Sequence, residues 1–294
     1  VGGSVLALPL FLLAPLPLAI AAFGWGTPAG VVAGLAAIGG VGFVFGTPAM
    51  ISMLLADVVP TLVAVHYLGL ARQVDPADPA AREWYPLGRV LTILSVLVMI
   101  GTVLAGVAIG FDVEETSGQV VAAYRDMMVR SGVSPTQMPD ATQLEPFVRG
   151  TVRLIPAFFP ATWTLVLVFD LWSAAKVVRR SDRLARADED VAAVELPSAA
   201  GLACVTALVV AVFLDGPIGT VAAVVAGTLT SAHLLVGLGV IHTLARRSPA
   251  KIIVLAFVYG LVLLFTLPAR LIALAGLVEP HIGLRRRFPP VRPA

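Results

Sequence analysis

The chain is poor in charged residues, and this shortage decides its class. Only 13% of its 294 residues are Asp, Glu, Lys or Arg, whereas a soluble domain carries about 25%. A soluble fold of this size would need those missing charges on its surface, so lipid must surround most of the chain. In lipid every backbone N–H and C=O has to pair internally, which leaves only helices or closed barrels.

Several other features are scarce or missing. The single cysteine, Cys204, lies inside an apolar run, which excludes an intramolecular disulfide and a thiol metal site. The net charge of +2 gives no reason to expect a nucleic-acid partner. Walker A, GxGxxG, HExxH and GxSxG motifs are absent, and no catalytic residue types stand at useful spacing. We therefore expect no enzyme, no catalytic residue, no cofactor and no metal. Val1 opens the chain without a basic segment, so the first apolar run is not expected to be a signal peptide.

What the chain does contain is a series of continuous apolar runs. They are roughly 20 residues long, the length at which a helix crosses about 30 Å of hydrocarbon, and they lack the alternation of barrel strands. The sequence predicts an all-α fold: a polytopic membrane helical bundle of about eight transmembrane helices, forming a single domain over residues 1–294. The predicted segments are Ser4–Phe23, Ala29–Phe45, Thr47–Leu70, Leu87–Phe111, Leu154–Val178, Ala199–Leu214, Gly219–Leu244 and Ile252–Leu277.

Loop charges predict the orientation. The loops after the third, fifth and seventh segments hold eleven basic residues, and the long loop 112–153 holds four. Because cytoplasmic loops are enriched in Lys and Arg, we expect a multi-pass protein of the bacterial cytoplasmic (inner) membrane with the eleven inside. The eleven are Arg72, Arg82, Arg89, Lys176, Arg179, Arg180, Arg183, Arg186, Arg246, Arg247 and Lys251; the four are Arg125, Arg130, Arg149 and Arg153.

Two regions leave alternatives open. The basic tail 279–294 would fall outside if the segments simply alternate, so either the last helix breaks at Pro268 and returns, or one helix is miscounted. The extracytoplasmic loop 112–153 reads as an amphipathic helical pair. It either lies on the membrane surface or forms a lid over a cavity.

Ionisable residues at membrane depth are the candidates for function, because charge is costly there. Asp57 lies within the third segment with Thr61 one turn further on, Asp170 lies in the fifth, and His233 lies in the seventh. Each also has a plainer interpretation. Asp57 either serves a ligand or pairs with a neighbouring helix, Asp170 could be interfacial, and His233 could make an interhelical hydrogen bond. We expect Asp57 to face the bundle interior.

Small residues and prolines predict helix packing. A stripe of small residues at every fourth position lets helix backbones approach closely; it consists of Gly219, Ala223, Gly227 and Ser231. Pro15 and Pro17 in the first segment each remove a backbone donor. They indicate either a broken helix that lines a cavity, or a helix that starts after Pro17 or ends before Pro15.

Several strings, taken in order, resemble the YybS-like family of predicted bacterial membrane proteins. The resemblance covers nearly the whole chain. It is carried by Ala14–Leu18 ahead of Gly24–Gly26, by Glu83–Arg89, by Ile155-Pro156 leading to Asp170–Trp172, and by Gly276-Leu277 leading to Leu284–Arg287.

That family is distantly similar to the substrate-binding S components of energy-coupling-factor transporters. The similarity implies a helical bundle with a small-molecule pocket that works with partner ATPase and coupling subunits. It also implies a further hydrophobic helix ahead of the first one here. Asp170 stands where the resemblance leads us to expect Asn, so no role is carried over to it.

These observations support two hypotheses of different classes. The leading one is a transporter-like component that binds a small-molecule substrate in the lipid bilayer, has no ATPase of its own and works with partner membrane or ATPase subunits. The alternative is a structural or assembly membrane protein that acts through helix–helix contacts. A polar cavity near mid-membrane favours the first, and a dry, filled bundle favours the second.

Overall fold

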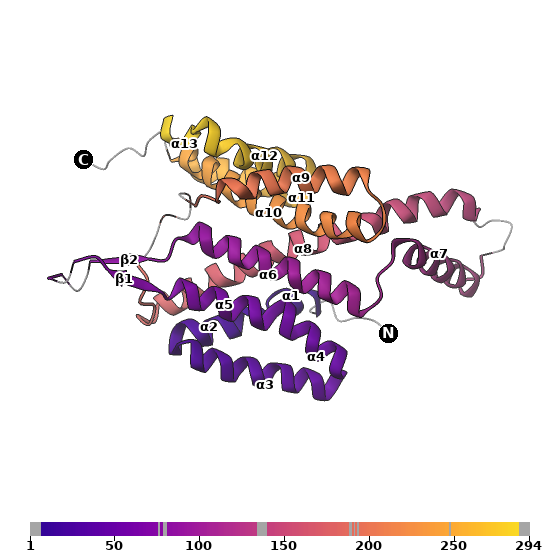
Figure 1. Ribbon diagram of the computed structural model, residues 1–294, viewed down its shortest axis with the longest axis horizontal. Coiled ribbons are helices and arrows are strands. Elements are labelled where there is room, and N and C mark those ends of the chain that lie inside the picture. The colour runs from indigo at the N-terminus through magenta and orange to yellow at the C-terminus, as the bar shows by residue number, and fades with distance from the viewer. Residues whose placement is uncertain are drawn as a thin grey trace.

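A computed structural model of the chain describes residues 7–75, 77–78, 81–133, 140–187, 190, 192, 194–246 and 248–287. Helices make up nearly all of this part, which confirms the predicted all-α bundle (Figure 1). Within the described residues the strands are confined to one hairpin, in which β1 (Ala71–Gln73) pairs antiparallel with β2 (Arg82–Trp84). Residues 1–6 and 288–294, which belong to the predicted first segment and the basic tail, lie outside the described part.

The helices follow the predicted segments in order. The first half of the chain contains α1 (Ala7–Leu12), α2 (Pro15–Trp25), α3 (Thr27–Phe45), α4 (Thr47–Met53), the π-helical turn η1 (Leu54–Val58), α5 (Val59–Leu68) and α6 (Leu87–Ala108). The second half contains α7 (Val113–Arg130), α8 (Ala141–Arg179), α9 (Ser198–Phe213), α10 (Gly216–Ala245), α11 (Lys251–Leu264), α12 (Thr266–Ile282) and α13 (Leu284–Arg287).

The tripeptide Gly-Thr-Pro occurs at the boundary between α2 and α3 and again at the boundary between α3 and α4. In each case the glycine lies between the helices, and the threonine and proline begin the next helix. Gly26 and Gly46 have φ angles of +89° and +86°, which glycine adopts without steric cost. The proline two residues later has the φ angle that the first turn of a helix needs. This repeated motif ends one apolar helix and starts the next within a single residue.

The count of membrane spans is lower than predicted. Within the described residues five helices are long and apolar enough to cross a bilayer, or six if one bent pair counts as a single span. Pro9–Trp25 and Ser198–Phe213 are shorter apolar helices. Within the first of these, a two-residue turn at Leu13 and Ala14 separates α1 from α2, and α2 begins at Pro15 rather than after Pro17. A hydrophobic run therefore located each helix but not its continuous length.

The eighth predicted segment is not one straight helix. It breaks at Phe265, and α11 and α12 are bent by 115° relative to each other. Pro268 lies inside the first turn of α12, so the break comes three residues earlier than expected. α12 returns beside α10, and Arg285 just beyond it hydrogen-bonds the carbonyl oxygens of Ala192 and Val194. The described part of the basic tail thus lies at the same end of the bundle as the α8–α9 loop.

The described part of the long loop 112–153 contains the two expected helices, α7 and the start of α8. Its second half is the start of α8, which has 39 residues and is about 58 Å long at 1.5 Å per residue. α7 packs against this extension, and both project from the end of the bundle instead of covering it (Figure 1).

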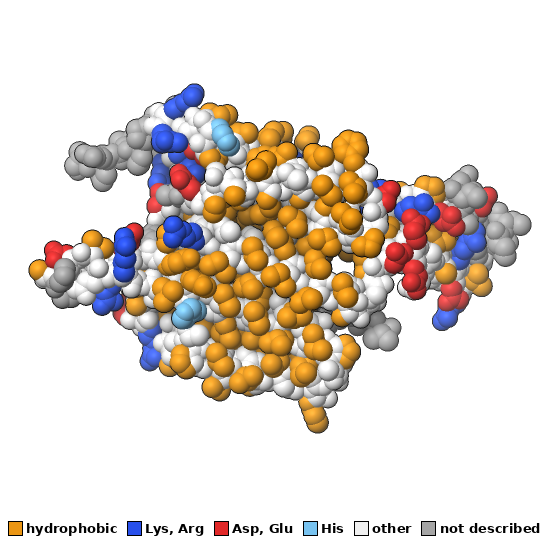
Figure 2. Space-filling model, viewed as in Figure 1, with side chains coloured by type: hydrophobic (Ala, Val, Ile, Leu, Met, Phe, Trp, Pro, Cys, Tyr) orange, Lys and Arg blue, Asp and Glu red, His pale blue; other side chains and the backbone are white. Residues whose placement is uncertain are grey.

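α10 is the central helix of the second half. A Cβ atom at Gly227 would lie 2.0 Å from the carbonyl oxygen of Ala157 on α8, and one at Gly276 on α12 would lie 2.0 Å from that of His233. The first half packs around an apolar core from α2, α5, α6 and α8 that includes Leu94 and Leu167. Apolar side chains cover the middle of the face seen in Figure 2, and charged ones gather at both ends. This is the surface of a helical membrane protein.

Candidate functional site

Three of the four polar candidates are buried, on two neighbouring parts of the core: η1 with α5, and α8. Asp57 belongs to η1, Thr61 to the first turn of α5 and Asp170 to α8. Their exposed fractions are 8%, 0% and 1%. The indole of Trp163, about two helical turns before Asp170 on α8, bonds to the carbonyl oxygen of Ala56 beside Asp57. The structure thus places Asp57 in the interior of the bundle, and Asp170 is buried in the same core. We call these three residues the acidic centre.

The local backbone explains how Asp57 is presented. The N–H of Val59 bonds to the carbonyl oxygen of Leu54, five residues back, which widens the helix into a π turn. Pro60 has no N–H, so the carbonyl of Ala56 loses its usual donor four residues on. The indole nitrogen of Trp163 on α8 donates to that oxygen at 2.9 Å. Pro60 therefore interrupts the regular helical hydrogen bonds and leaves the carbonyl oxygen of Ala56 free to accept the bond from α8. Single π turns occur frequently at functional sites.

The polar atoms of the acidic centre lack partners. Within the described residues, the buried side-chain atoms without a hydrogen bond are Oδ1 of Asp57, Oγ1 of Thr61 and both carboxylate oxygens of Asp170. No salt bridge among those residues reaches either carboxyl group. Burying an ionised carboxylate without a partner is strongly unfavourable, so a buried pair must be neutralised by protons or by a cation. The centre is therefore suited to hold and release positive charge.

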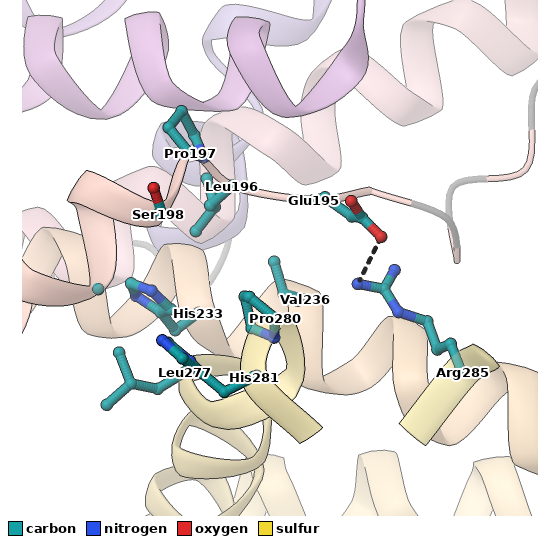
Figure 3. A pocket seen from close by; sticks show the side chains of 12 residues that line it. Glu195, Leu196, Pro197, Ser198, His233, Val236, Leu277, Pro280, His281 and Arg285 are labelled. Carbon is teal, nitrogen blue, oxygen red and sulfur yellow. Dashed lines mark ion pairs between the residues drawn. The ribbon is translucent and has the colours of Figure 1, made fainter. Parts of the chain in front are cut away.

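His233 is not part of the acidic centre. It lies on α10, is 4% exposed, and its Nδ1 lies 2.7 Å from the carbonyl oxygen of Leu229. Figure 3 shows it with Ser198, Leu277 and His281, at a cavity between the start of α9 and the end of α12. That cavity has a volume of about 10 Å³, about the room that one water molecule needs. Leu229 belongs to α10 as well, so the observed contact is within one helix and not the interhelical bond that the sequence suggested.

The small-residue stripe is used in more than one contact. Gly227 touches the backbone of α8, as described above. A Cβ at Gly219 would lie 2.0 Å from the carbonyl oxygen of Leu214, in the turn before its own helix. Ser231 is buried and donates to the carbonyl oxygen of Thr228, and Ala223 is half-buried. The four residues of the stripe therefore do not form a single face that packs against one neighbouring helix.

Sequence reasoning missed a group of buried charges at the basic end of the bundle. Arg186, 8% exposed, donates to the carbonyl oxygens of Leu68 and Tyr85, both at 2.9 Å. Glu279, 4% exposed, accepts from the backbone N–H and from Nε of Arg285. The sequence signal for this group was Glu279, an acidic residue at the start of a tail that is otherwise rich in arginine. These contacts fasten the loops and the returning α12 at one end.

Comparison with known proteins gives one match. The family model described as "Predicted membrane protein (DUF2232)" matches residues 4–278. This match confirms the resemblance to the YybS-like family. No curated protein and no solved structure matches the chain. The similarity to S components of energy-coupling-factor transporters is not shown by these comparisons.

Proposed function

We propose that this chain, which belongs to the DUF2232 family of predicted membrane proteins, is a transport-type binding component. Its ligand site is the acidic centre of Asp57, Thr61 and Asp170. One observation carries the proposal: two buried carboxyl groups without partners lie inside an otherwise apolar bundle. Ionisable groups inside a membrane are costly, and they mark substrate and ion pathways.

The proposal includes how the protein works in the membrane. We place the basic end of the bundle in the bacterial cytoplasm, following the excess of Lys and Arg there. Since the chain has no Walker A motif, partner membrane or ATPase subunits would supply energy if transport is driven by ATP. Nothing in the sequence suggests an enzyme.

Access to the acidic centre requires a movement. The unpartnered oxygens of Asp57, Thr61 and Asp170 are closed off from the surface. A ligand therefore enters only when helices separate, and the π turn beside Pro60 is a place where the helix already departs from regular geometry. The transport proposal thus predicts that the centre opens part of the time.

Cysteine accessibility tests this. In a Cys204→Ala background, Thr61→Cys should react with a small water-soluble thiol reagent in membranes. Thr228→Cys is the matched control, because Thr228 is also 0% exposed but donates to Val224 within α10. Ser181→Cys lies at an exposed turn and is the positive control, which should react completely. If Thr61→Cys is as inert as Thr228→Cys, the transport proposal fails.

A scaffold is the second candidate function. The cavity at His233 and the open apolar groove between α9 and α10 both lie away from the acidic centre, which is the outcome expected for a scaffold. The groove is lined by residues that include Ala203, Thr206 and Ala222. Small residues in such a groove permit close approach of a helix from a partner. An inert Thr61→Cys would favour this function.

A further inference from the structure

The acidic centre offers oxygen atoms and no nitrogen. Its four unpartnered buried atoms are three carboxylate oxygens and one hydroxyl oxygen, and they are all the unpartnered buried side-chain atoms that the described residues contain. Carboxylate and hydroxyl oxygens are hard ligands, which suit hard cations such as Na⁺, Ca²⁺ and Mg²⁺. An anion or a thiol-seeking metal finds no suitable group there.

Thr61 is exceptional among the buried hydroxyl residues. Seven Ser and Thr residues are buried in the described part. Six of them donate to a backbone carbonyl three or four residues back: Ser95, Ser117, Thr164, Thr228, Ser231 and Thr243. Thr61 makes no such bond, although it is 0% exposed. Its oxygen therefore stays available to a ligand, on the helix that carries Asp57 one turn earlier.

The charge of the centre limits what can bind. Two carboxylates without a basic partner carry two negative charges in an apolar core, so neutrality requires two positive ones. Two protons meet this need when the centre is empty, and one monovalent cation together with one proton meets it when a cation is bound. A divalent cation meets it too, but Ca²⁺ takes six to eight oxygens and Mg²⁺ keeps several of its waters. The centre offers four unpartnered oxygens that are closed to the surface.

We propose that the ligand of the acidic centre is a small monovalent cation, with Na⁺ as the probe, held by Asp57 and Asp170 with Thr61 as a third ligand. This inference rests on the proposed transport function and names its ligand. Since the centre is closed, Na⁺ binds after an opening and is occluded when α5 and α8 close over it. Binding then stabilises the closed bundle.

Thermal unfolding of the purified full chain tests the inference. At constant ionic strength, replacing choline chloride with NaCl should raise the Tm in a saturable way, on the order of 5 °C at a hundredfold excess over Kd. CaCl₂ and MgCl₂ should not reproduce the rise. No rise with NaCl, an equal rise with choline, or a larger rise with a divalent cation each overturns the inference.

Variants separate a ligand role from a structural one. Asp57→Asn and Asp170→Asn should each abolish the Na⁺ response while raising the Tm in Na⁺-free buffer, because one buried carboxyl group is gone. Asp126→Asn on the exposed surface of α7 is the control and should keep the full response. Thr61→Ser should keep it as well, whereas Thr61→Val should weaken Na⁺ affinity about tenfold. If Thr61→Val responds like the wild type, Thr61 is not a ligand.

The two proposals fail in different ways. If Na⁺ has no effect but Thr61→Cys still reacts, the centre opens for another ligand and only the cation assignment is wrong. If Na⁺ stabilises the protein but Thr61→Cys stays inert, the cation is a fixed structural ion and the transport function is wrong.

Discussion

At the scale of single residues, Pro60 has the widest consequences. Its missing N–H leaves the carbonyl of Ala56 without a helical donor, and Trp163 supplies one from α8. The rings of Phe11 and Phe159 lie against Trp163, with centroids 5.2 Å and 6.2 Å away. The indole is therefore held by packing as well as by its hydrogen bond, and the position of η1 relative to α8 is fixed beside the two carboxyl groups.

Glycine at position 227 sets the distance between α8 and α10. In Gly227→Ala the new Cβ would lie 2.0 Å from the carbonyl oxygen of Ala157, so the two backbones must separate. We expect a loss of stability of about 1–3 kcal/mol. Thermal unfolding in detergent measures it.

Gly260→Ala is the matched control for this change. Gly260 lies inside α11, and a Cβ there would meet nothing within 4 Å. Alanine is the better helix former, so this variant should be neutral or slightly more stable. Equal stabilities of the two variants would show that α8 and α10 are not closely packed at Gly227.

At the scale of elements, the α8–α9 loop is fastened to α10 by an ion pair. Nη1 of Arg246 donates to Oδ2 of Asp190 at 2.7 Å, and Nη2 donates to Oδ1. The Arg246 guanidinium is the main cause that lowers the pKa of the Asp190 carboxyl; burial opposes this, and the N–H of Ala192 and nearby His242 add to the lowering. Both side chains are partly exposed, so the pair contributes at most about 1 kcal/mol.

The sign of the pKa shift predicts a pH dependence. Because folding lowers the pKa of Asp190, its stabilising contribution is complete above the unfolded value of about 3.9. It is lost as pH falls through the lower folded value. Asp190→Asn should therefore be less stable than the wild type at pH 7 by up to about 1 kcal/mol. The difference between the two should shrink as pH falls below about 3.9.

Denaturation curves over this pH range provide the measurement. High salt should reduce the difference at pH 7, since a partly exposed pair is screened. A difference that persists at the lowest pH would mean that the Asp190→Asn substitution perturbs the loop for a reason other than charge.

At the scale of the whole molecule, the break at Phe265 brings the basic residues together. The α8–α9 loop, the α10–α11 turn and the end of α12 meet at one end of the bundle through Asp190–Arg246 and through Arg285 with Ala192. α7 and the start of α8 form the other end (Figure 1). Because α12 returns to the basic end, the described part of the tail lies at the same end as the basic α8–α9 loop. The tail therefore no longer conflicts with the orientation that the loop charges predict.

Labelling of intact cells tests this topology. In a Cys204→Ala background, Ser181→Cys and His281→Cys should both be protected from a membrane-impermeant thiol reagent, and Ser131→Cys should react. All three positions are exposed, and lysis should make all of them reactive. Labelling of Ser181→Cys in intact cells would reverse the orientation. Labelling of His281→Cys together with Ser131→Cys would mean that α11 and α12 cross the membrane instead of returning.

The sequence by itself determined that this is a helical membrane protein, where its helices lie, and that Asp57 faces inward. These conclusions depend on local quantities: the length of an apolar run, and the cost of a charge in hydrocarbon whatever its neighbours are. The tertiary structure alone decided that Asp170 is buried without a partner in the same core as Asp57 while His233 has a partner within its own helix, that Trp163 bonds to the π turn, and that α12 returns after Phe265. Each of these depends on which helices pack together, and contacts between distant segments leave no periodic signal in one sequence.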